Sequence, residues 1–359
     1  VIAVTWQSVL RQCMERVCTM EKSAVSKATA IDFVITWVDG SDPEWLRSKQ
    51  SFQCTAKADD AVERYRDWGL LKFWFRGVEA FAPWVRRIHF VTCGHVPNWL
   101  ETNHPQLHIV RHTDYMPLDA CPTFNSNAIE LGMHRIPGLA EQFVYFNDDT
   151  YLLRSMQPTD FFRNGHPCDD AILSPIMPNW GEEIARTVLN NMYLINKHFT
   201  KQSVWKQHKK IFLTPRYGIQ LLRTLCLMPW RHFPGFKNDH LPIAYLKSTF
   251  EHVWACEPEL LNKVIHHRFR HYESDVSHWL MRYWQFCEGT IAPASVSRGR
   301  DLPIDDLATA EAIRRQRYGL ICINDTKTLS DDFETVQQRL VSAFESILPK
   351  KCSFEKEAT

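Results

Sequence analysis

Hydrophobic and polar positions along the chain alternate between short β-branched runs and longer amphipathic stretches. Apolar and aromatic runs that end in polar turns are typical of buried strands. Five such strands are predicted, over residues 31–38, 88–92, 107–110, 143–146 and 320–323. Helical spacing predicts helices over 64–83, from about 126 to 142, and over 331–348. This order of elements favours an α/β fold with a mostly parallel, Rossmann-like sheet.

The same patterns divide the 359 residues into four consecutive parts. Apolar residues at helical spacing predict an N-terminal helical segment over residues 1–30, followed by an α/β core over 31–160. Proline-rich turns and helical patterns indicate a mainly helical insertion over 161–290, and residues 291–359 supply a strand and a helix that complete the core. Within the insertion, helices are predicted near 183–208, 215–228 and 266–288.

Composition and charge exclude several classes of protein. The 42 basic and 41 acidic residues leave a net charge of +1, which argues against a nucleic-acid partner. Hydrophobic residues at 45% and charged residues at 23% are typical of a globular chain. The 11 cysteines show no CxxC pair, which favours reduced thiols in a cytoplasmic protein. We find no signal peptide and no apolar run of membrane-spanning length.

Polar side chains follow two of the predicted strands, as Asn147-Asp148-Asp149 and Asn324-Asp325. In α/β sheets, ligands bind beyond the carboxyl ends of the strands. Neighbouring carboxylates at such a position suit Mg²⁺ or Mn²⁺, which prefer oxygen ligands and neutralise phosphate charge. An Asx turn or a helix N-cap uses the same residue types and is the alternative interpretation.

Three charged residues of the first half allow two interpretations each. Asp32 lies inside the first strand, where an unpaired charge is costly. It is either a solvent-facing residue at the start of the strand or a buried carboxylate that orients a ligand or a cationic side chain. His134-Arg135 follows Glu130 by about one helical turn, so that a cation and a carboxylate form either a surface ion pair or part of a site.

In the second half, His240-Leu241-Pro242 and the stretch from His267 to His271 concentrate acid–base and phosphate-binding groups. Asp275 is close enough in sequence to pair with Arg270 or to orient a neighbouring histidine, and a histidine–carboxylate pair can deprotonate an alcohol. A purely structural histidine is the alternative. The chain has no GxGxxG, Walker or GxSxG motif, so nicotinamide dehydrogenases, P-loop NTPases and α/β-hydrolases have no support.

Longer stretches of the chain are similar to known conserved regions. The run IDFVITWVDGSD begins at Ile31, and RYRD, APWVR, PNWL, PTFNS and FNDD follow between residues 64 and 149. HLP at 240–242, RFR with Asp275, and ICIND at 321–325 come later in the chain. In this order, and over about residues 31–350, these motifs resemble the four conserved regions of the Stealth family. Bacterial capsule and cell-surface polysaccharide phosphotransferases belong to that family.

The resemblance implies a glycosyltransferase-A-like fold in which the core of residues 31–160 binds a nucleotide sugar and 161–290 contacts the acceptor. It implies transfer of hexose 1-phosphate or N-acetylhexosamine 1-phosphate from a UDP-sugar to a hydroxyl of an acceptor glycan, with release of UMP. The implied partners are a UDP-sugar and an oligosaccharide that such pathways often link to lipid. We therefore expect a cytoplasmic enzyme that associates peripherally with the inner face of the membrane.

The resemblance also implies roles for single residues. Asp148 and Asp149 are expected to hold Mg²⁺ or Mn²⁺. His240, or His271 together with Asp275, is the expected base, and Arg270 stabilises the transferred phosphate. The expected catalytic residues are Asp32, His240, Arg270, His271 and Asp275. Substrate binding is expected from Trp37, Asp39, Arg66, Asn125, Ser126, Glu130, Arg135, Asn147, Asn324 and Asp325.

Two other functions share part of this chemistry. A metal-dependent UDP-sugar glycosyltransferase would use the same donor and metal but release UDP. A non-catalytic sugar-binding or scaffold protein would lack acidic groups at the strand ends, whereas Asp148, Asp149 and Asp325 are present. The sequence departs from the family pattern at Trp68, where asparagine is expected. Asn127 lies where members of the family differ, so the preference for donor or acceptor can differ too.

Overall fold

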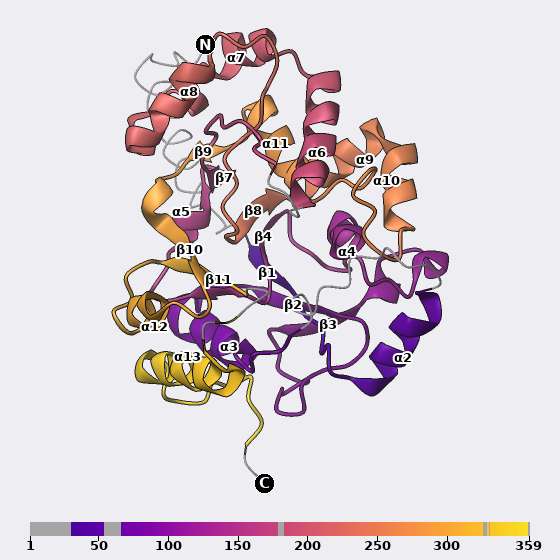
Figure 1. The fold of residues 1–359 in the computed structure, drawn as a ribbon, viewed down its shortest axis with the longest axis vertical. Helices are drawn as coiled ribbons and strands as arrows, with labels where there is room; N and C mark the ends of the chain where they lie inside the picture. The colour runs from indigo at the N-terminus through magenta and orange to yellow at the C-terminus, as the bar shows by residue number, and fades with distance from the viewer. Residues whose placement is uncertain (1–29, 54–65, 179–182, 326–328, 330, 358–359) are drawn as a thin grey trace, which may run out of the picture. The chain divides into compact units, whose positions relative to one another are not determined.

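The computed structural model describes residues 30–53, 66–178, 183–325, 329 and 331–357, and a five-stranded sheet lies at its centre (Figure 1). The strand order is β3-β2-β1-β4-β8, in which the first four strands are parallel and β8 is antiparallel to β4. The strands are β1 (Ile31–Thr36), β2 (Arg87–Thr92), β3 (Leu107–Arg111), β4 (Gln142–Phe146) and β8 (Ile243–Leu246). This sheet confirms the predicted α/β fold.

Strand β1 shows why the sheet is covered on both faces. Phe33 and Ile35 pack into one hydrophobic cluster, whereas Val34 between them packs into a second. Successive side chains of a strand point to opposite faces, so both faces are buried, as is usual for parallel sheets. The first cluster includes α3 (Leu71–Phe81) and α13 (Phe333–Ile347). The second includes α4 (Ser126–Leu131), α9 (Lys247–Cys256) and α11 (Trp279–Glu288).

The remaining elements surround this core. Helices α6 to α11 lie on one side of the central sheet, and α3, α12 and α13 lie on the other (Figure 1). The remaining helices are α2 (Pro43–Phe52), α5 (Pro158–Phe161), α6 (Ile184–His198), α7 (Lys201–Phe212), α8 (Leu221–Leu227), α10 (Pro258–Ile265) and α12 (Leu307–Arg314). Short 3₁₀ helices cover His112–Asp114, Leu118–Ala120, Met133–Arg135, Pro215–Gln220 and Val296–Arg298.

Two small sheets accompany the central one, in the orders β10-β11-β5 and β6-β7-β9. Their strands are β5 (Thr150–Leu152), β6 (Phe162–Arg163), β7 (His166–Asp169), β9 (Ala292–Pro293), β10 (Gly299–Pro303) and β11 (Leu320–Asn324). The predicted strand over 320–323 exists as β11, but it pairs with β10 and β5 instead of joining the central sheet. Sequence periodicity identifies a strand without identifying its partners.

The helix predicted over 64–83 is shorter than expected, because α3 begins only at Leu71. Gly69 takes a left-handed conformation with φ +67°, which a helix cannot include. Trp68 before it is held in place elsewhere: its indole Nε1 donates to Asp325 at 2.9 Å, and its carbonyl accepts from Gln337 at 2.9 Å. The first two residues of the predicted helix lie outside the described residues.

Two other predicted helices also have different bounds. The helix expected to reach residue 142 ends at Leu131, and Pro137 with left-handed Gly138 (φ +74°) turns the chain towards β4. The helix expected over 266–288 begins at Trp279, because Asp275 holds the residues before it in a turn. The tail helix predicted over 331–348 is confirmed as α13, whose N-cap is Asp332.

Residues 31–359 form one compact unit. The predicted boundaries at 160 and 290 stay predictions, and the helix predicted over 1–30 lies almost entirely outside the described residues. Within the described part of the chain the cysteines are free thiols. No helix among the described residues is both long enough and apolar enough to cross a bilayer.

Candidate functional site

A cavity of about 570 Å³ lies beyond the carboxyl ends of β1 and β4. Thr36 and Trp37 line it from the end of β1, Asn147 from the end of β4, and Asn324 from the end of β11. Side chains from distant parts of the sequence therefore meet in one place. This is the edge at which α/β sheets generally bind their ligands.

Asp148 and Asp149 form the acidic part of the cavity. Two contacts hold their turn, since the Thr150 hydroxyl donates to the Asn147 carbonyl at 2.7 Å and the Tyr151 hydroxyl to the Asp148 carbonyl at 2.9 Å. Desolvation and, next, the charge of Asp149 raise the pKa of Asp148. The Oδ1 atom of Asp149 is buried without a hydrogen-bond partner among the described residues. Such an oxygen is suited to a bound cation.

Asp149, His240 and Cys322 bring three possible metal-ligating atoms within 4.8 Å of one another. Nδ1 of His240 lies 3.6 Å from Asp149 Oδ2 and 3.3 Å from Asn324 Oδ1. Burial alone would lower the pKa of His240. The charge of Asp149 and the contact with Asn324 have the larger combined effect, so the pKa of His240 is raised. Burial raises the pKa of Cys322 well above its ordinary value. The carboxylate oxygens of Asp149 fit a hard divalent cation better than this thiol does.

Two arginines supply positive charge to the same cavity. Arg66 Nη1 lies 3.2 Å from Asp325 Oδ1. Arg270 Nη2 donates to the Ser126 hydroxyl at 2.8 Å and makes no ion pair with any described residue. The guanidinium of Arg270 therefore keeps N–H donors for a ligand, and its planar fork is suited to phosphate oxygens.

Glu130 of α4 contributes a buried carboxylate to the wall of the cavity. The Tyr145 hydroxyl donates to its Oε1 at 3.1 Å, and Oε2 lies 3.7 Å from Nε2 of His278. Burial raises the pKa of Glu130 to about 7, although the charge of Arg270 and the Tyr145 hydrogen bond oppose this shift. Burial also lowers the pKa of His278 to about 3, so that its ring is neutral. Near neutral pH, Glu130 can therefore gain or lose a proton.

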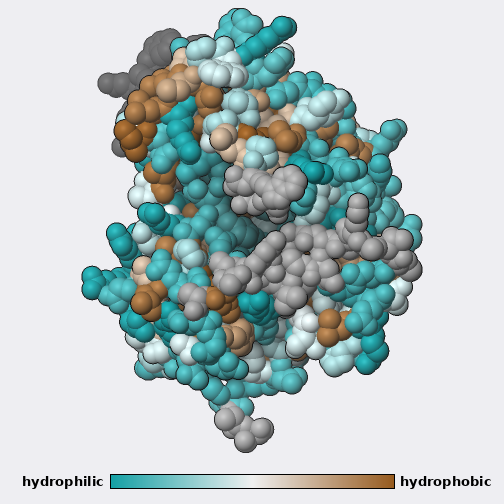
Figure 2. All heavy atoms as spheres, viewed as in Figure 1, coloured by the Kyte–Doolittle hydropathy of each residue, from teal (hydrophilic) through white to brown (hydrophobic). Residues whose placement is uncertain are grey.

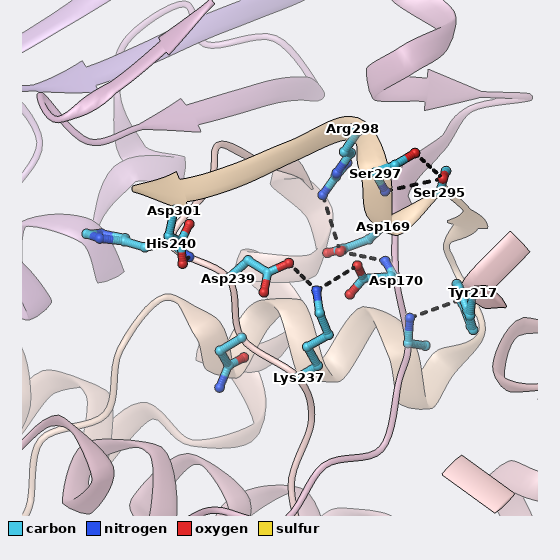
Figure 3. Close-up of polar contacts among 12 residues, drawn as sticks. Asp169, Asp170, Tyr217, Lys237, Asp239, His240, Ser295, Ser297, Arg298 and Asp301 are labelled. Atoms are coloured by element: carbon cyan, nitrogen blue, oxygen red, sulfur yellow. Dashed lines mark hydrogen bonds and ion pairs between the residues drawn. The ribbon is translucent and has the colours of Figure 1, made fainter. Parts of the chain in front are cut away.

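His240 stands at the end of a loop that is fixed at several points. Lys237 Nζ lies 3.3 Å from Asp170 Oδ2 and also contacts the Asp239 carboxylate, and the backbone N–H of His240 donates to Asp301 Oδ2 at 3.0 Å. Figure 3 shows Lys237 between Asp170 and Asp239, with Asp301 beside His240. These contacts determine where the imidazole of His240 lies.

Arg282 of α11 ties this loop to a buried group of charges. It is 4% exposed, and its guanidinium donates to both carboxylate oxygens of Asp169, at 2.7 and 2.8 Å. The same guanidinium donates to the Lys237 carbonyl at 2.8 Å and to Asn238 Oδ1 at 3.0 Å. Arg298 adds a contact of 3.4 Å to Asp169, which Figure 3 also shows. A bidentate buried pair of this kind fixes geometry more firmly than a surface pair does.

Most of the residues predicted for the site line this cavity. They are Trp37, Arg66, Ser126, Glu130, Asn147, Asp148, Asp149, His240, Arg270, Asn324 and Asp325. They come from three predicted strand ends and from segments far apart in the sequence. The structure therefore brings together the acidic, basic and imidazole groups that the sequence analysis selected.

Asp32 does not belong to this group. It lies at the opposite end of β1, about 13 Å from the cavity at the strand rise of 3.3 Å per residue. Its carboxylate accepts from Arg86 Nε at 2.7 Å, from His89 Nε2 at 3.0 Å and from the Ala140 backbone at 2.8 Å. This position does not support the predicted catalytic role, and these contacts match the interpretation of a buried carboxylate that orients cationic side chains.

Arg135 and His271 also lie away from the cavity. Because α4 ends at Leu131, Arg135 does not follow Glu130 on one helix face, and its guanidinium stacks on the Trp254 ring at 4.0 Å. The ring of His271 is exposed, and its Nδ1 lies 3.0 Å from the Ser274 hydroxyl. The roles predicted for these two residues are therefore not supported by their positions.

Asp275 and Asn125 act behind the cavity wall. Asp275 is completely buried and contacts His267 Nδ1 at 2.6 Å, Asn125 Nδ2 at 3.0 Å and the backbone N–H of His271 at 2.9 Å. The partner of Asp275 is thus the ring of His267, not the ring of His271. Asn125 also caps α4 through the Asn127 N–H. Both residues shape the turn that carries Arg270.

Asp39 holds the loop after β1 instead of lining the cavity. Its backbone N–H donates to His95 Nε2 at 2.8 Å, and its carboxylate accepts from the Ser41 backbone at 2.9 Å. Asp39 does not line the described cavity, so its position does not support the predicted direct contact with the substrate.

The sequence analysis missed several cavity residues. Asp67 and His278 line the wall, Cys322 lies beside Asp149 and His240, and Asp301 holds the backbone of His240. Cys322 precedes Asn324 by two positions on one strand, so the period of two places both side chains on the same face. That signal was available in the sequence. Asp301 and His278 carry no comparable local signal.

Comparison with known proteins gives three matches to family models. Stealth protein conserved region 1 matches residues 29–54, conserved region 2 matches 64–169, and conserved region 4 matches 311–359. The similarity of residues 240–275 to the third region stays a prediction. A solved galactosyltransferase, LgtC, covers 88% of this chain and 96% of its own, at 11% identity and a TM-score of 0.39.

Curated relatives match over nearly their full length. Capsular polysaccharide phosphotransferase WcwK of Streptococcus pneumoniae is 41% identical over 332 residues, which cover 91% of this chain and 98% of that protein. Exopolysaccharide phosphotransferase cps2G of Lactiplantibacillus plantarum is 40% identical, covering 91% and 96%. Receptor polysaccharide phosphotransferase WefC of Streptococcus oralis is 37% identical, covering 90% and 99%. The chain therefore belongs to the Stealth family, and it is a phosphotransferase.

Proposed function

We propose that this enzyme transfers a sugar 1-phosphate from a UDP-sugar to a hydroxyl group of an acceptor glycan. The acceptor oxygen attacks the β-phosphorus of the donor, a phosphodiester forms, and the bond from that phosphorus to UMP breaks. The observation that carries this proposal is the cavity in which Asp148, Asp149, Arg66, Arg270 and His240 meet. Phosphoryl transfer depends mainly on positioning and charge neutralisation, and these side chains supply both.

We propose that Asp148 and Asp149 hold Mg²⁺ or Mn²⁺. The buried, unpartnered Oδ1 of Asp149 supports this assignment. When bound, the cation neutralises charge on the diphosphate and on the leaving UMP. Arg270 forms no ion pair with any described residue and can donate to the transferred phosphate, and Arg66 adds a second positive charge in the same cavity.

We propose His240 as the base that accepts the proton of the acceptor hydroxyl. It is the only predicted base that lines the described cavity, and its loop is fixed by contacts on several sides. Glu130 lies in the same wall with a pKa near neutrality. It is positioned to hold a hydroxyl of the substrate and to balance the charge of Arg270.

The names of the relatives support a bacterial capsular polysaccharide or exopolysaccharide as the acceptor. Lipid linkage of that acceptor and a cytoplasmic location at the inner face of the membrane stay predictions of the sequence analysis.

Product analysis tests the proposal. The protein is incubated with Mn²⁺ or Mg²⁺, a panel of UDP-sugars and candidate oligosaccharide acceptors, and the released nucleotides are separated by chromatography. UMP that forms only when acceptor and metal are both present supports sugar 1-phosphate transfer. UDP would show glycosyl transfer and overturn the proposed reaction. Asp149→Asn serves as the matched catalytic control, because it keeps the shape of the side chain but loses its charge.

A further inference from the structure

Large apolar side chains gather on the exterior of α8 and the segments beside it. We call this region, residues 206–232, the α8 surface. Figure 2 shows the hydrophobic atoms over α8 at the upper left of the molecule. Ile219, Leu222 and Trp230 are 77%, 53% and 57% exposed. Leu213, Leu225 and Met228 are further exposed members of the group. A contiguous exposed apolar patch of this kind generally marks an interaction site.

The charge of this region differs from that of the whole chain. The chain as a whole is nearly neutral, yet residues 184–238 contain ten Lys and Arg and no Asp or Glu. Six of these cations lie in the α8 surface, are exposed and form no ion pair with any described residue. They are Lys206, Lys209, Lys210, Arg216, Arg223 and Arg231. The surface is therefore apolar and positively charged at the same time.

The exposed face belongs to a firmly attached segment. The Tyr217 hydroxyl accepts from the Ala171 backbone at 3.0 Å and donates to the Ile211 carbonyl at 2.6 Å. The Thr224 hydroxyl accepts from the Leu173 backbone at 3.1 Å. Both side chains are fully buried, and Figure 3 shows the contact of Tyr217. The described residues thus fix the inner side of α8 to the core and leave its outer side exposed.

Cationic and apolar residues alternate along that outer side. Arg223 stands between Leu222 and Leu225, and Arg231 directly follows Trp230. Apolar side chains beside Lys and Arg are the pattern of segments that lie in the interface of a bilayer. Tryptophan is enriched at that depth, because its ring is apolar and its N–H is polar. The charge favours an anionic partner, and an anionic lipid surface accommodates both kinds of side chain.

We propose that the α8 surface docks the enzyme peripherally on a bilayer that contains anionic lipid. The apolar side chains enter the boundary between headgroups and acyl chains, and the six cations contact lipid phosphates. The short helix α8 lies in the plane of the interface and does not cross it. This inference concerns attachment and does not depend on the proposed reaction.

Vesicle flotation tests this attachment without any substrate. The full chain is mixed with vesicles of phosphatidylcholine alone, or of phosphatidylcholine and phosphatidylglycerol, which supplies the anionic surface that attracts polybasic segments. We expect binding to the anionic vesicles that weakens with added salt. Leu222→Glu with Leu225→Glu is expected to weaken this binding at least tenfold. Charge reversal of Arg216, Arg223 and Arg231 should weaken it more, since each cation near an anionic surface strengthens binding roughly fivefold.

The matched control is Leu307→Glu, because Leu307 is 71% exposed at the start of α12, on the other side of the sheet. We expect this variant to bind vesicles like the unmodified chain. Thermal unfolding of every variant checks that the fold is kept. Absence of binding by the unmodified chain, or binding that both sets of α8 variants retain, would overturn the proposal. A dimer that Leu222→Glu with Leu225→Glu dissociates, without vesicle binding, would assign the surface to a second copy and overturn the proposal equally.

Discussion

The buried contacts of Asp32 allow its two interpretations to be separated by one substitution. Asp32 is completely buried and accepts two hydrogen bonds from Arg86, one from His89 and one from the Ala140 backbone. Asp32→Asn keeps the shape of the side chain, removes its charge and directs an amide N–H₂ towards other donors. We expect this variant to lose stability but to keep its activity.

The size of the loss follows from what happens to each partner. A hydrogen bond to a charged group contributes about 1.5–3 kcal/mol. The side chain of Arg86 is 42% exposed, so water can hydrate its guanidinium after the substitution. The ring of His89 is completely buried and would lose its hydrogen-bond partner without hydration. We therefore expect the free energy of unfolding to fall by about 3 kcal/mol, at the lower end of the cost of breaking a buried pair. The melting temperature should fall by about 5 °C in a chain of this length.

The effect should also depend on pH. Burial favours the protonated form of Asp32, but the contacts with Arg86, His89 and Ala140 outweigh it and lower its pKa in the folded chain. A lowered pKa stabilises the fold above the ordinary unfolded value of about 3.9, and this stabilisation is lost as the pH falls through the folded value. The difference between Asp32→Asn and the unmodified chain should be full at pH 7 and smaller near pH 3.5.

Urea unfolding at both pH values measures this difference, and kcat at 25 °C measures activity. Arg87→Gln is the control, because Arg87 neighbours Arg86 but forms no ion pair with any described residue. Asp32 lies about 13 Å from the cavity, so kcat should stay within about twofold of the unmodified enzyme. A variant with normal unfolding free energy and little turnover would refute the structural role and show that Asp32 takes part in the chemistry.

Three further substitutions test the cavity itself. Asp149→Asn should lower kcat at least about 100-fold with an unchanged melting temperature, as expected from lost charge stabilisation; near-normal turnover would exclude Asp149 as a cation ligand. Glu130→Gln should stabilise the fold by up to about 3 kcal/mol at pH 8 but not at pH 4, because a pKa raised from 4.5 to about 7 costs stability progressively as the pH rises between these two values and fully above the upper one; an equal effect of the substitution at both pH values would contradict the burial argument. Arg270→Lys should lower kcat/KM about tenfold by losing the planar fork, and an unchanged kcat/KM would place the phosphate elsewhere.

The strands were the most predictable part of the molecule. In β1 and β4, β-branched and aromatic residues occupy both faces, and this composition is sufficient to identify buried parallel strands. The rule that ligands bind at carboxyl ends then selected Asn147, Asp148 and Asp149 correctly as lining residues. Local sequence was adequate here because each of these features depends on neighbouring residues only.

Pairings over long distances could not be predicted in the same way. Asp275 has three histidines within eight positions, and the sequence does not show that His267, and not His271, faces it. Asp32 is the second residue of its predicted strand, so the rule that ligands bind at carboxyl ends already argues against a place in the cavity. The sequence does not show its partners Arg86, His89 and Ala140, because that group depends on the packing of distant elements.

The position of His240 also depends on contacts between residues that are far apart in the sequence. Lys237, Asp169 and Arg282 each resemble ordinary surface charges in the sequence, yet they meet in a buried group that holds the loop before His240. Charged residues are buried at a cost that is acceptable only when every partner is in place. The least regular part of the sequence therefore supplies the most constrained contacts around the proposed base. Its distance from Asp149 depends on those contacts as much as on the central sheet.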